Sequence, residues 1–354
     1  MAVRQHSDTT LLNDAGIRVS ARSPVIVSAS RSTDIPAFYT RWFFHRLDRG
    51  YSSWTNPFSG VRSCISFDKT RFIVFWSKNP YPLLSCLPLL KKRGIGCYVQ
   101  YTLNDYDHDS LEPGVPPLQQ RIDTFRRLVD SLGYGSVVWR FDPLLLTATI
   151  TPDSLMRKID NIARQLDGYT EKLVFSFADI ASYRKVRGNL TLHGVDYCEW
   201  DKSQMTEMAQ MIASAYGNRL QLATCCEQID LGHLGISHNK CIDDALIARI
   251  AHDDKVLMDH LGMKTVRITS DLFSGTPVIP HDAIALGDGL YAIRSRSNRD
   301  AGQRAFCGCI EAKDIGSYNT CPHMCRYCYA NVSEKAVAAN RRIHLSDPLG
   351  ESII

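Results

Sequence analysis

Long apolar runs are missing from this chain of 354 residues. Its most apolar stretches, residues 72–76 and 83–90, are short or interrupted by proline, whereas a membrane-spanning helix needs about 20 apolar residues. The first residues, MAVRQHSDTTLLNDAG, contain no apolar core of the kind found in secretory signal peptides. We therefore expect no membrane segment and a cytoplasmic location, where thiols stay reduced.

A large excess of charge of one sign is also missing. The 41 Lys and Arg residues and 37 Asp and Glu residues give a net charge of +4, well below the loading of a dedicated nucleic-acid-binding domain. This balance allows an anionic substrate or nucleic acid as a partner without requiring either. The sequence has no repeat or low-complexity segment, and its 44% hydrophobic and 22% charged content excludes a disordered, collagen-like or coiled-coil chain.

What the chain does have is an alternation of strand-like and helix-like segments. Six nearly continuous apolar strings, typical of buried parallel strands, occupy residues 25–30, 72–76, 97–103, 137–143, 173–179 and 222–227. They are separated by helix-like, largely amphipathic segments at residues 36–49, 82–92, 117–132, 152–166 and 202–216. Six β/α units in series predict an α/β fold with a parallel sheet, and residues 52–67 predict an extra hairpin.

Polar side chains collect where the apolar strings end. The carboxyl ends of parallel strands meet at one edge of a sheet, which is where such folds keep their sites. Arg140 and Asp142 lie two positions apart and so on one face of a strand, and burying them is costly unless they are paired. The set comprises Ser30, Arg31, Asp34, Lys78, Asn79, Thr102, Asn104, Arg140, Asp142, Ser176, Asp179, Cys225, Cys226 and Glu227.

Twelve cysteines form two distributions. Seven are scattered, as small buried hydrophobic residues often are, and five crowd into the segment CGCIEAKDIGSYNTCPHMCRYCYAN at residues 307–331. Within it, Cys321, Cys325 and Cys328 are spaced to wrap around one face of a [4Fe–4S] cluster and to leave one iron open. Zinc is the rival, with His323, Cys307 or Cys309 as the fourth ligand. The spacing alone does not decide between the two metals.

The residues around the motif resemble a known superfamily. CPHMCRYCYAN, with Tyr327 just before the third cysteine, resembles the CxxxCxxC signature of radical S-adenosylmethionine (radical SAM) enzymes. The chain departs from their usual layout because its motif lies near the C-terminus and no Gly-Gly-Glu follows the second strand. It is more similar to an uncharacterised bacterial family of radical-SAM-like proteins. The shared motifs are SASRSTDIPAFY (28–39), NPF (56–58), VFWSKNP (74–80), WRFDP (139–143), CCEQIDL (225–231) and the complete tail segment.

This resemblance implies a partial (β/α)6 barrel at residues 23–252, whose mouth is covered by a cysteine-rich tail at residues 305–354. Residues 1–22 are an N-terminal extension, and residues 253–304 are a variable connecting region. It also implies an enzyme that cleaves S-adenosylmethionine at a [4Fe–4S] cluster held by Cys321, Cys325 and Cys328. A reductant such as flavodoxin or ferredoxin supplies the electron. The product is a 5′-deoxyadenosyl radical that acts on an unknown substrate, with transfer of the 3-amino-3-carboxypropyl group as a minority variant.

If the tail folds over the barrel mouth, the strand-end residues would supply polar contacts to the cofactor. Asp142, Asp179 or Glu227 would accept hydrogen bonds from the ribose or amino group, and Arg31, Lys78 or Arg140 would meet the carboxylate. Lys78 and Arg140 have an alternative role as internal ion-pair partners. We predict that the remaining contacts to the cofactor come from Ser30, Asn79, Ser176, Tyr327 and Tyr329. The thiols predicted to act at the site, without holding the cluster, are Cys307, Cys309, Cys225 and Cys226.

A second hypothesis is a zinc-binding module without catalytic activity that binds nucleic acid. In that case the tail would be a zinc knuckle and nearby basic residues would face the nucleic acid. These residues are Arg294, Arg296, Arg299, Arg304, Lys313, Arg326, Arg341 and Arg342.

Overall fold

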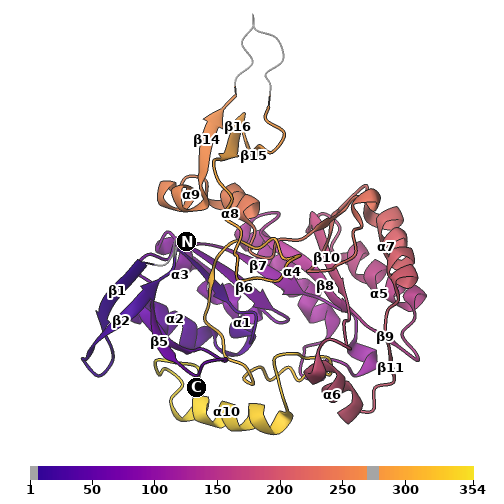
Figure 1. Ribbon diagram of the computed structural model, residues 1–354, viewed down its shortest axis with the longest axis horizontal. Coiled ribbons are helices and arrows are strands. Elements are labelled where there is room, and N and C mark those ends of the chain that lie inside the picture. Colours follow the sequence, from indigo (N-terminus) through magenta and orange to yellow (C-terminus); the bar gives the residue numbers. More distant parts are fainter. Residues whose placement is uncertain (1–6, 269–278) are drawn as a thin grey trace, which may run out of the picture.

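A computed structural model describes residues 7–268 and 279–354 (Figure 1). The first six residues of the N-terminal extension and residues 269–278 of the connecting region therefore lie outside the described residues. None of the helices in these described ranges is long and apolar enough to cross a membrane.

The centre of the fold is an eight-stranded sheet in the order β13-β12-β10-β8-β7-β6-β3-β17, and its pairings are parallel. All six predicted strands are present, so the prediction of an α/β fold with a parallel sheet is confirmed. The sheet is open, with β13 and β17 at its edges. The strands are β3 (Ile26–Ala29), β6 (Phe72–Ser77), β7 (Gly96–Thr102), β8 (Val137–Leu144), β10 (Lys172–Phe177), β12 (Gln221–Thr224), β13 (Ile236–His238) and β17 (Lys313–Asp314).

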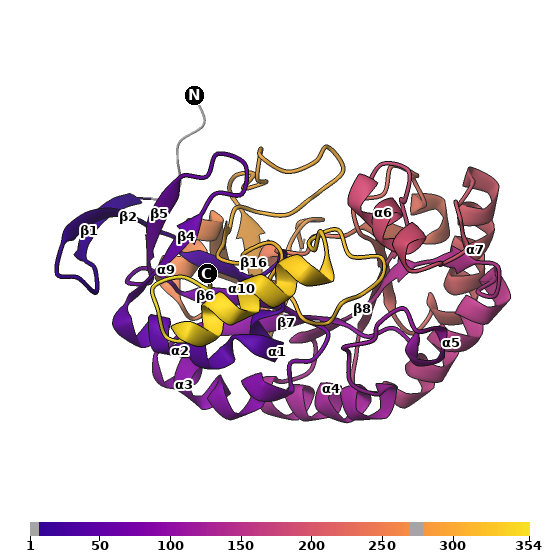
Figure 2. The same ribbon diagram turned by 90° about the horizontal axis from the view of Figure 1, so that it is seen from below.

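The five predicted helical segments are also confirmed, and they form an arc along one side of the sheet (Figure 2). Sequence signals define their ends: at α5, Thr151 and Ser154 form a capping box around Pro152. Apolar side chains of these helices bury one face of the sheet. The helices are α1 (Ile35–Phe38), α2 (Thr40–Arg49), the 3-10 helix η1 (Tyr81–Cys86), α3 (Leu87–Lys92), α4 (Leu118–Leu132), α5 (Pro152–Gln165) and α7 (Lys202–Tyr216).

The opposite face of the sheet carries a second apolar cluster. Side chains of α8 (Asp244–Ala251) and α9 (Lys255–Leu261) pack there together with Cys241, Cys309 and Ile310. The sheet is therefore buried on both faces, which explains why its strands read as continuous apolar strings.

Two small sheets flank this centre. The predicted hairpin is β4 (Tyr51–Thr55) with β5 (Arg62–Ser66), and it is joined by β1 (Ser7–Leu12) and β2 (Arg18–Ser23) from the N-terminal extension. The connecting region forms a projecting antiparallel sheet, visible at the top of Figure 1. Its strands are β14 (Met263–Arg267), β15 (Ile284–Gly287) and β16 (Leu290–Arg294). The remaining short elements are η2 (Asp107–Asp109), β9 (Leu146–Thr147), α6 (Arg184–Leu192), β11 (Tyr197–Cys198) and η3 (Gly232–Leu234).

The cysteine-rich tail returns to the sheet. Its strand β17 adds to the edge beside β3, a loop follows, and helix α10 (Glu334–Ser346) then crosses in front of the strands inside the arc of helices (Figure 2). This path brings residues more than 280 positions apart into contact.

Candidate functional site

The loop at residues 317–331 lies over segments that follow three strands of the sheet. The Tyr39 hydroxyl donates to the Thr320 carbonyl at 2.5 Å, beyond β3. The Arg326 amide donates to the Leu111 carbonyl at 2.9 Å, beyond β7. Asn189, which lies in α6 beyond β10, donates to the carbonyl of Cys328 at 3.0 Å. Long-range hydrogen bonds therefore hold this loop at the carboxyl ends of the strands, where polar residues were predicted to gather.

This loop carries Cys321, Cys325 and Cys328, which we call the loop thiols. Burial raises the pKa of each thiol, and the charges of its two neighbours raise the pKa of Cys325 further, so the three sulfurs lie close enough to interact. Met324, at φ 55°, turns the chain between the first two cysteines. Nevertheless, within the described ranges no three His, Cys, Asp or Glu side chains are already placed to hold a metal ion. Ligation by the loop thiols requires their side chains to turn toward a common centre.

His323, in the middle of the motif, anchors the loop. Its Nε2 lies 2.8 Å from Asp34 Oδ2 and its Nδ1 lies 3.0 Å from the Gly114 carbonyl. Burial opposes ionisation of Asp34, but His323, the Lys78 amide and the Ser77 hydroxyl together lower the pKa of this carboxyl. A side chain at Gly114 would come within 2.6 Å of the Pro322 carbonyl oxygen. Because both ring nitrogens are engaged, His323 is not free to be a fourth metal ligand in this arrangement.

Lys78 and Tyr327 belong to a buried ionic network beside the loop thiols. Lys78 Nζ lies 2.8 Å from Glu112 Oε1 and 3.0 Å from the Tyr327 hydroxyl. Asn104 donates to the same carboxylate and the same hydroxyl, each at 3.0 Å, and Tyr327 also donates to Glu112. Burial lowers the pKa of Lys78, but its charge interactions with Glu112 and Cys325 and its hydrogen bond to Glu112 together raise it. The ion-pair alternative for Lys78 is therefore present in the structure.

Glu112 was not predicted from the sequence. It lies in the turn-like segment DSLEPG, where a carboxylate usually faces solvent, yet its side chain is 1% exposed and also pairs with Arg121 at 3.6 Å. The signal that could have found it is the buried Lys78, which needs a partner.

Arg140 and Asp142 pair with each other, as their spacing in β8 predicts. Arg140 Nη1 also lies 3.2 Å from Gln100 Oε1 and 3.1 Å from Cys241 Sγ. Asp142 accepts a further hydrogen bond from Ser176 at the end of β10. The charged strand-end residues of β8 are thus satisfied inside the protein.

Arg31 differs from the other two predicted basic residues because it is incompletely satisfied. Its guanidinium lies 5.5 Å from the ring centroid of Trp76. Three buried polar atoms at the ends of β3 and β6 find no hydrogen-bond partner in the described part of the chain: Arg31 Nη2, Thr33 Oγ1 and Trp76 Nε1. Unpaired buried polar atoms are costly, so a polar ligand at this point would stabilise the protein.

The other predicted cofactor contacts have mixed surroundings. Ser30 Oγ lies 3.1 Å from Ser32 Oγ, and it accepts hydrogen bonds from the backbone amides of Ser32 and Thr33 in the turn that follows β3. Asp179 is exposed and accepts from the Ser182 amide at 3.1 Å, so it stabilises a turn. Glu227 accepts from the Phe177 amide at 2.9 Å, and burial raises its pKa to about 7. Asn79 is half-buried, and Tyr329 donates its hydroxyl to the Arg31 carbonyl while its ring stays 46% exposed.

A second group of thiols lies on the face of the sheet opposite the arc of helices. Cys225, Cys241, Cys307 and Cys309 form it, and we call them the interior thiols. Cys225 Sγ lies 3.5 Å from Cys241 Sγ, and Cys309 hydrogen-bonds to the thiols of both Cys241 and Cys307. Three of the four were predicted to act at the site. Cys241 was not, because its surroundings, SHNKCIDD, contain no strand-end or ligand spacing.

Cys226 lies beside this group without joining the chain of thiol contacts. Its backbone has a φ of 62°. Burial is the main cause that raises its pKa, while Arg304 lowers it.

A sequence profile that matches residues 26–330 decides the family; its description is Domain of unknown function (DUF1848). The chain belongs to the DUF1848 family. The match runs from β3 to the end of the motif loop, so it includes the sheet and both groups of thiols. No curated protein and no solved structure matches the chain.

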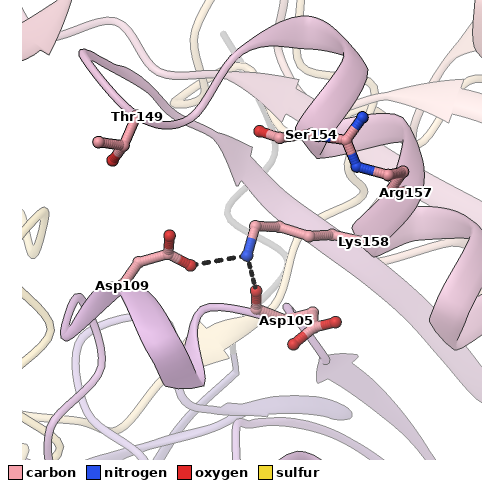
Figure 3. Close-up of a pocket in the computed structure, with 6 residues that line it drawn as sticks. All are labelled: Asp105, Asp109, Thr149, Ser154, Arg157 and Lys158. Atoms are coloured by element: carbon pink, nitrogen blue, oxygen red, sulfur yellow. Dashed lines mark hydrogen bonds and ion pairs between the residues drawn. The ribbon is translucent and has the colours of Figure 1, made fainter.

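A cavity of about 310 Å³ in this DUF1848 member lies away from these groups (Figure 3). It is lined by residues of η2, α5 and their loops, and Lys158 reaches across it to Asp109 Oδ2 at 2.7 Å and to the Asp105 carbonyl at 2.8 Å. No predicted site residue lines it. Lys158 and Asp109 in this cavity are already paired with each other. We therefore keep the motif loop and the strand ends beneath it as the candidate site.

Proposed function

We propose that this DUF1848 protein is a radical SAM enzyme built on a partial (β/α)6 barrel, with a [4Fe–4S] cluster held by the loop thiols. The observation that carries the proposal is the loop itself. Three half-buried cysteines at CxxxCxxC spacing lie in a loop that is held over the polar segments after β3, β7 and β10. Both features match what the sequence resemblance implies, and they come from opposite ends of the chain.

The donor set fits such a cluster. Three thiolates and no further free ligand would leave one iron open for a small molecule. The zinc alternative needs a fourth ligand, and all three candidates are engaged: His323 with Asp34 and Gly114, and Cys307 and Cys309 with Cys241. Burial raises the pKa of each loop thiol in the absence of a cation, so a cluster that supplies positive iron would stabilise the thiolates.

The unpaired polar atoms around Arg31 are the proposed partners of S-adenosylmethionine. Lys78 and Arg140 are satisfied by Glu112 and Asp142, which leaves Arg31 as the basic residue with an unpaired buried nitrogen for a carboxylate. Thr33 and Trp76 offer further unpaired polar atoms at the same strand ends.

When bound, the cluster supplies the electron that breaks a carbon–sulfur bond of the sulfonium, and a flavodoxin or ferredoxin is the proposed reductant. The chain's own residues position the partners. Tyr327, Asn104 and Glu112 hold the loop against β7, and Asp34 and His323 hold it against β3. Apolar side chains packed on both faces of the sheet exclude water from below the site. The substrate is unknown.

The test is anaerobic reconstitution with iron and sulfide, followed by reduction in the presence of S-adenosylmethionine and mass spectrometry of the products. We expect about four irons per chain at the loop thiols and release of 5′-deoxyadenosine or 5′-methylthioadenosine, according to which bond is cleaved. Cys198→Ser, at an exposed position, is the matched control and should behave as the wild type. A colourless protein, or an iron-loaded protein that leaves S-adenosylmethionine intact, would overturn the proposal.

A further inference from the structure

The interior thiols are drawn from three separate segments of the chain. Cys225 follows β12, Cys241 follows β13, and Cys307 and Cys309 precede β17. Their contacts run in one line, from Cys225 through Cys241 and Cys309 to Cys307. Four sulfurs from distant segments that meet in a buried place are more than the packing of small hydrophobic residues requires.

Two of these sulfurs each accept two hydrogen bonds from N–H groups. Cys309 Sγ accepts from the backbone amides of Cys241 at 3.2 Å and Ile242 at 3.4 Å. Cys241 Sγ accepts from Asn239 Nδ2 at 3.2 Å and Arg140 Nη1 at 3.1 Å. Neutral thiols are weak acceptors, whereas metal-bound sulfurs commonly receive such amide hydrogen bonds, which orient them and tune the metal.

The one short distance between these sulfurs is compatible with a single ion. Zinc–sulfur bonds of about 2.3 Å in a tetrahedron place neighbouring sulfurs about 3.8 Å apart. Cys225 and Cys241 are 3.5 Å apart, close to that edge. Cysteines that hold a cube are separated by the cube itself, so their sulfurs do not touch.

We propose that Cys225, Cys241, Cys307 and Cys309 bind one zinc ion, in a site separate from that of the loop thiols. A zinc ion with four thiolates carries a charge of −2. Arg140, a buried guanidinium that lies 3.1 Å from Cys241 Sγ, opposes this charge, and it shares its own charge with Asp142. Binding requires the outer thiols, Cys225 and Cys307, to turn inward, because the present line of contacts is not a preformed metal site.

The site would also have a structural effect. It joins the start of the cysteine-rich tail to the segments that follow β12 and β13, and the tail then runs into β17 and the motif loop. A bound zinc ion would therefore fix the point from which the loop thiols are delivered to the strand ends. This role does not depend on the proposed radical chemistry.

The experiment measures metal binding rather than activity. Apoprotein prepared with a chelator under reducing conditions is titrated with Zn²⁺ and, separately, with Co²⁺ as a spectroscopic probe. We expect one tightly bound zinc per chain, and with Co²⁺ the charge-transfer and visible bands of a tetrahedral four-sulfur site. Because Co²⁺ can also occupy the loop thiols, a Cys321→Ser/Cys325→Ser/Cys328→Ser protein should keep the full signal.

Single variants complete the test. Cys307→Ser, at a half-buried position, and Cys241→Ser should each weaken zinc binding at least tenfold, whereas Cys198→Ser should not change it. Circular dichroism checks that the variants are folded. If Cys241→Ser does not fold, the zinc stoichiometry of the Cys321→Ser/Cys325→Ser/Cys328→Ser protein still answers the question, and we expect one zinc per chain there. Absence of zinc binding, several irons at these cysteines after reconstitution, or a Cys225–Cys241 disulfide in anaerobically purified protein would each overturn the proposal.

Discussion

The two groups of thiols are built in opposite ways. The loop thiols come from eight consecutive residues, and the protein surrounds them with contacts to the backbone of their own loop. The interior thiols come from three segments between residues 225 and 309. Side-chain and backbone N–H groups donate two hydrogen bonds each to the sulfurs of Cys241 and Cys309. Burial is the main cause that raises the pKa of each loop thiol, whereas hydrogen bonds from Cys225 and Cys309, supported by Arg140, lower the pKa of Cys241.

This difference indicates different ligands. The loop thiols, of which Cys328 accepts one backbone amide at 3.3 Å, need a partner that brings strong positive charge, as an iron–sulfur cluster does. The interior thiols, whose central sulfur already accepts hydrogen bonds from Arg140 and Asn239, are suited to hold a single cation. The two groups should therefore respond independently to mutation, and the predictions below test that separation.

The largest effect is expected from removing the loop thiols. Cys325→Ala should abolish the iron–sulfur cluster and lower the turnover of S-adenosylmethionine below detection, because two thiolates cannot hold the cube. The sheet should stay folded, since the loop packs on it from one end. Iron analysis and circular dichroism provide the measurement. Full iron content in this variant would remove the distinction between the two groups.

Glu112→Ala should give the next largest effect. It leaves the buried charges of Lys78 and Arg121 without a full partner, which costs about 3–5 kcal/mol when a buried ion pair is broken. Chemical denaturation measures the loss in the free energy of unfolding, and Glu207→Ala, at an exposed position of α7, is the control. If the groups are independent, the Co²⁺ signal of the interior thiols survives in the folded fraction.

Gly114→Ala should displace the motif loop without removing any of its own groups. The new methyl group would come within 2.6 Å of the Pro322 carbonyl oxygen, and overpacking of this kind costs about 1–3 kcal/mol. We expect faster loss of iron from the reconstituted protein during anaerobic chelation. Gly188→Ala in α6, where a methyl group meets nothing within 4 Å, is the matched control and should keep the wild-type rate. Equal rates in both variants would contradict the anchoring role of Gly114.

Lys313→Met should give the smallest effect, on stability against pH. Burial lowers the pKa of Lys313 to about 8 from 10.5. Between these values the unfolded chain holds more protons than the folded one, so the free energy of unfolding of the wild type rises with pH across this window. The variant should lack this rise and be more stable at pH 7 by about 1 kcal/mol, since loss of the contact with the Trp54 ring offsets part of the gain. Thermal melts at pH 7, 9 and 10.5 check this, and identical pH profiles would refute it.

Sequence periodicity was sufficient for the centre of the fold. The apolar string at Phe72–Ser77 and the capping signals at Thr151 are local, and the structure realises both. The pairing of Arg140 with Asp142 was also predictable, because a two-residue spacing fixes their relative orientation in a strand.

Contacts between distant segments were not predictable in the same way. Asp34 was recognised as a strand-end residue, but its partner His323 lies 289 positions away. Glu112 and Cys241 sit in loops whose sequences carry no periodicity, and their burial depends on the return of the tail. Their roles follow from the folded chain and not from their neighbours in sequence.

Because β17 pairs with β3, the sheet is complete only after the C-terminal part of the chain has been synthesised. A nascent chain folds as it leaves the ribosome, N-terminal part first, so the six central strands emerge well before residues 307–331. The side chains at the strand ends then face water while the motif loop is still inside the exit tunnel or unfolded beside it. The proposed metals would therefore enter during or after the last stage of translation, and a ribosome stalled just beyond β16 would carry a nearly complete sheet without the cysteines at 307–328.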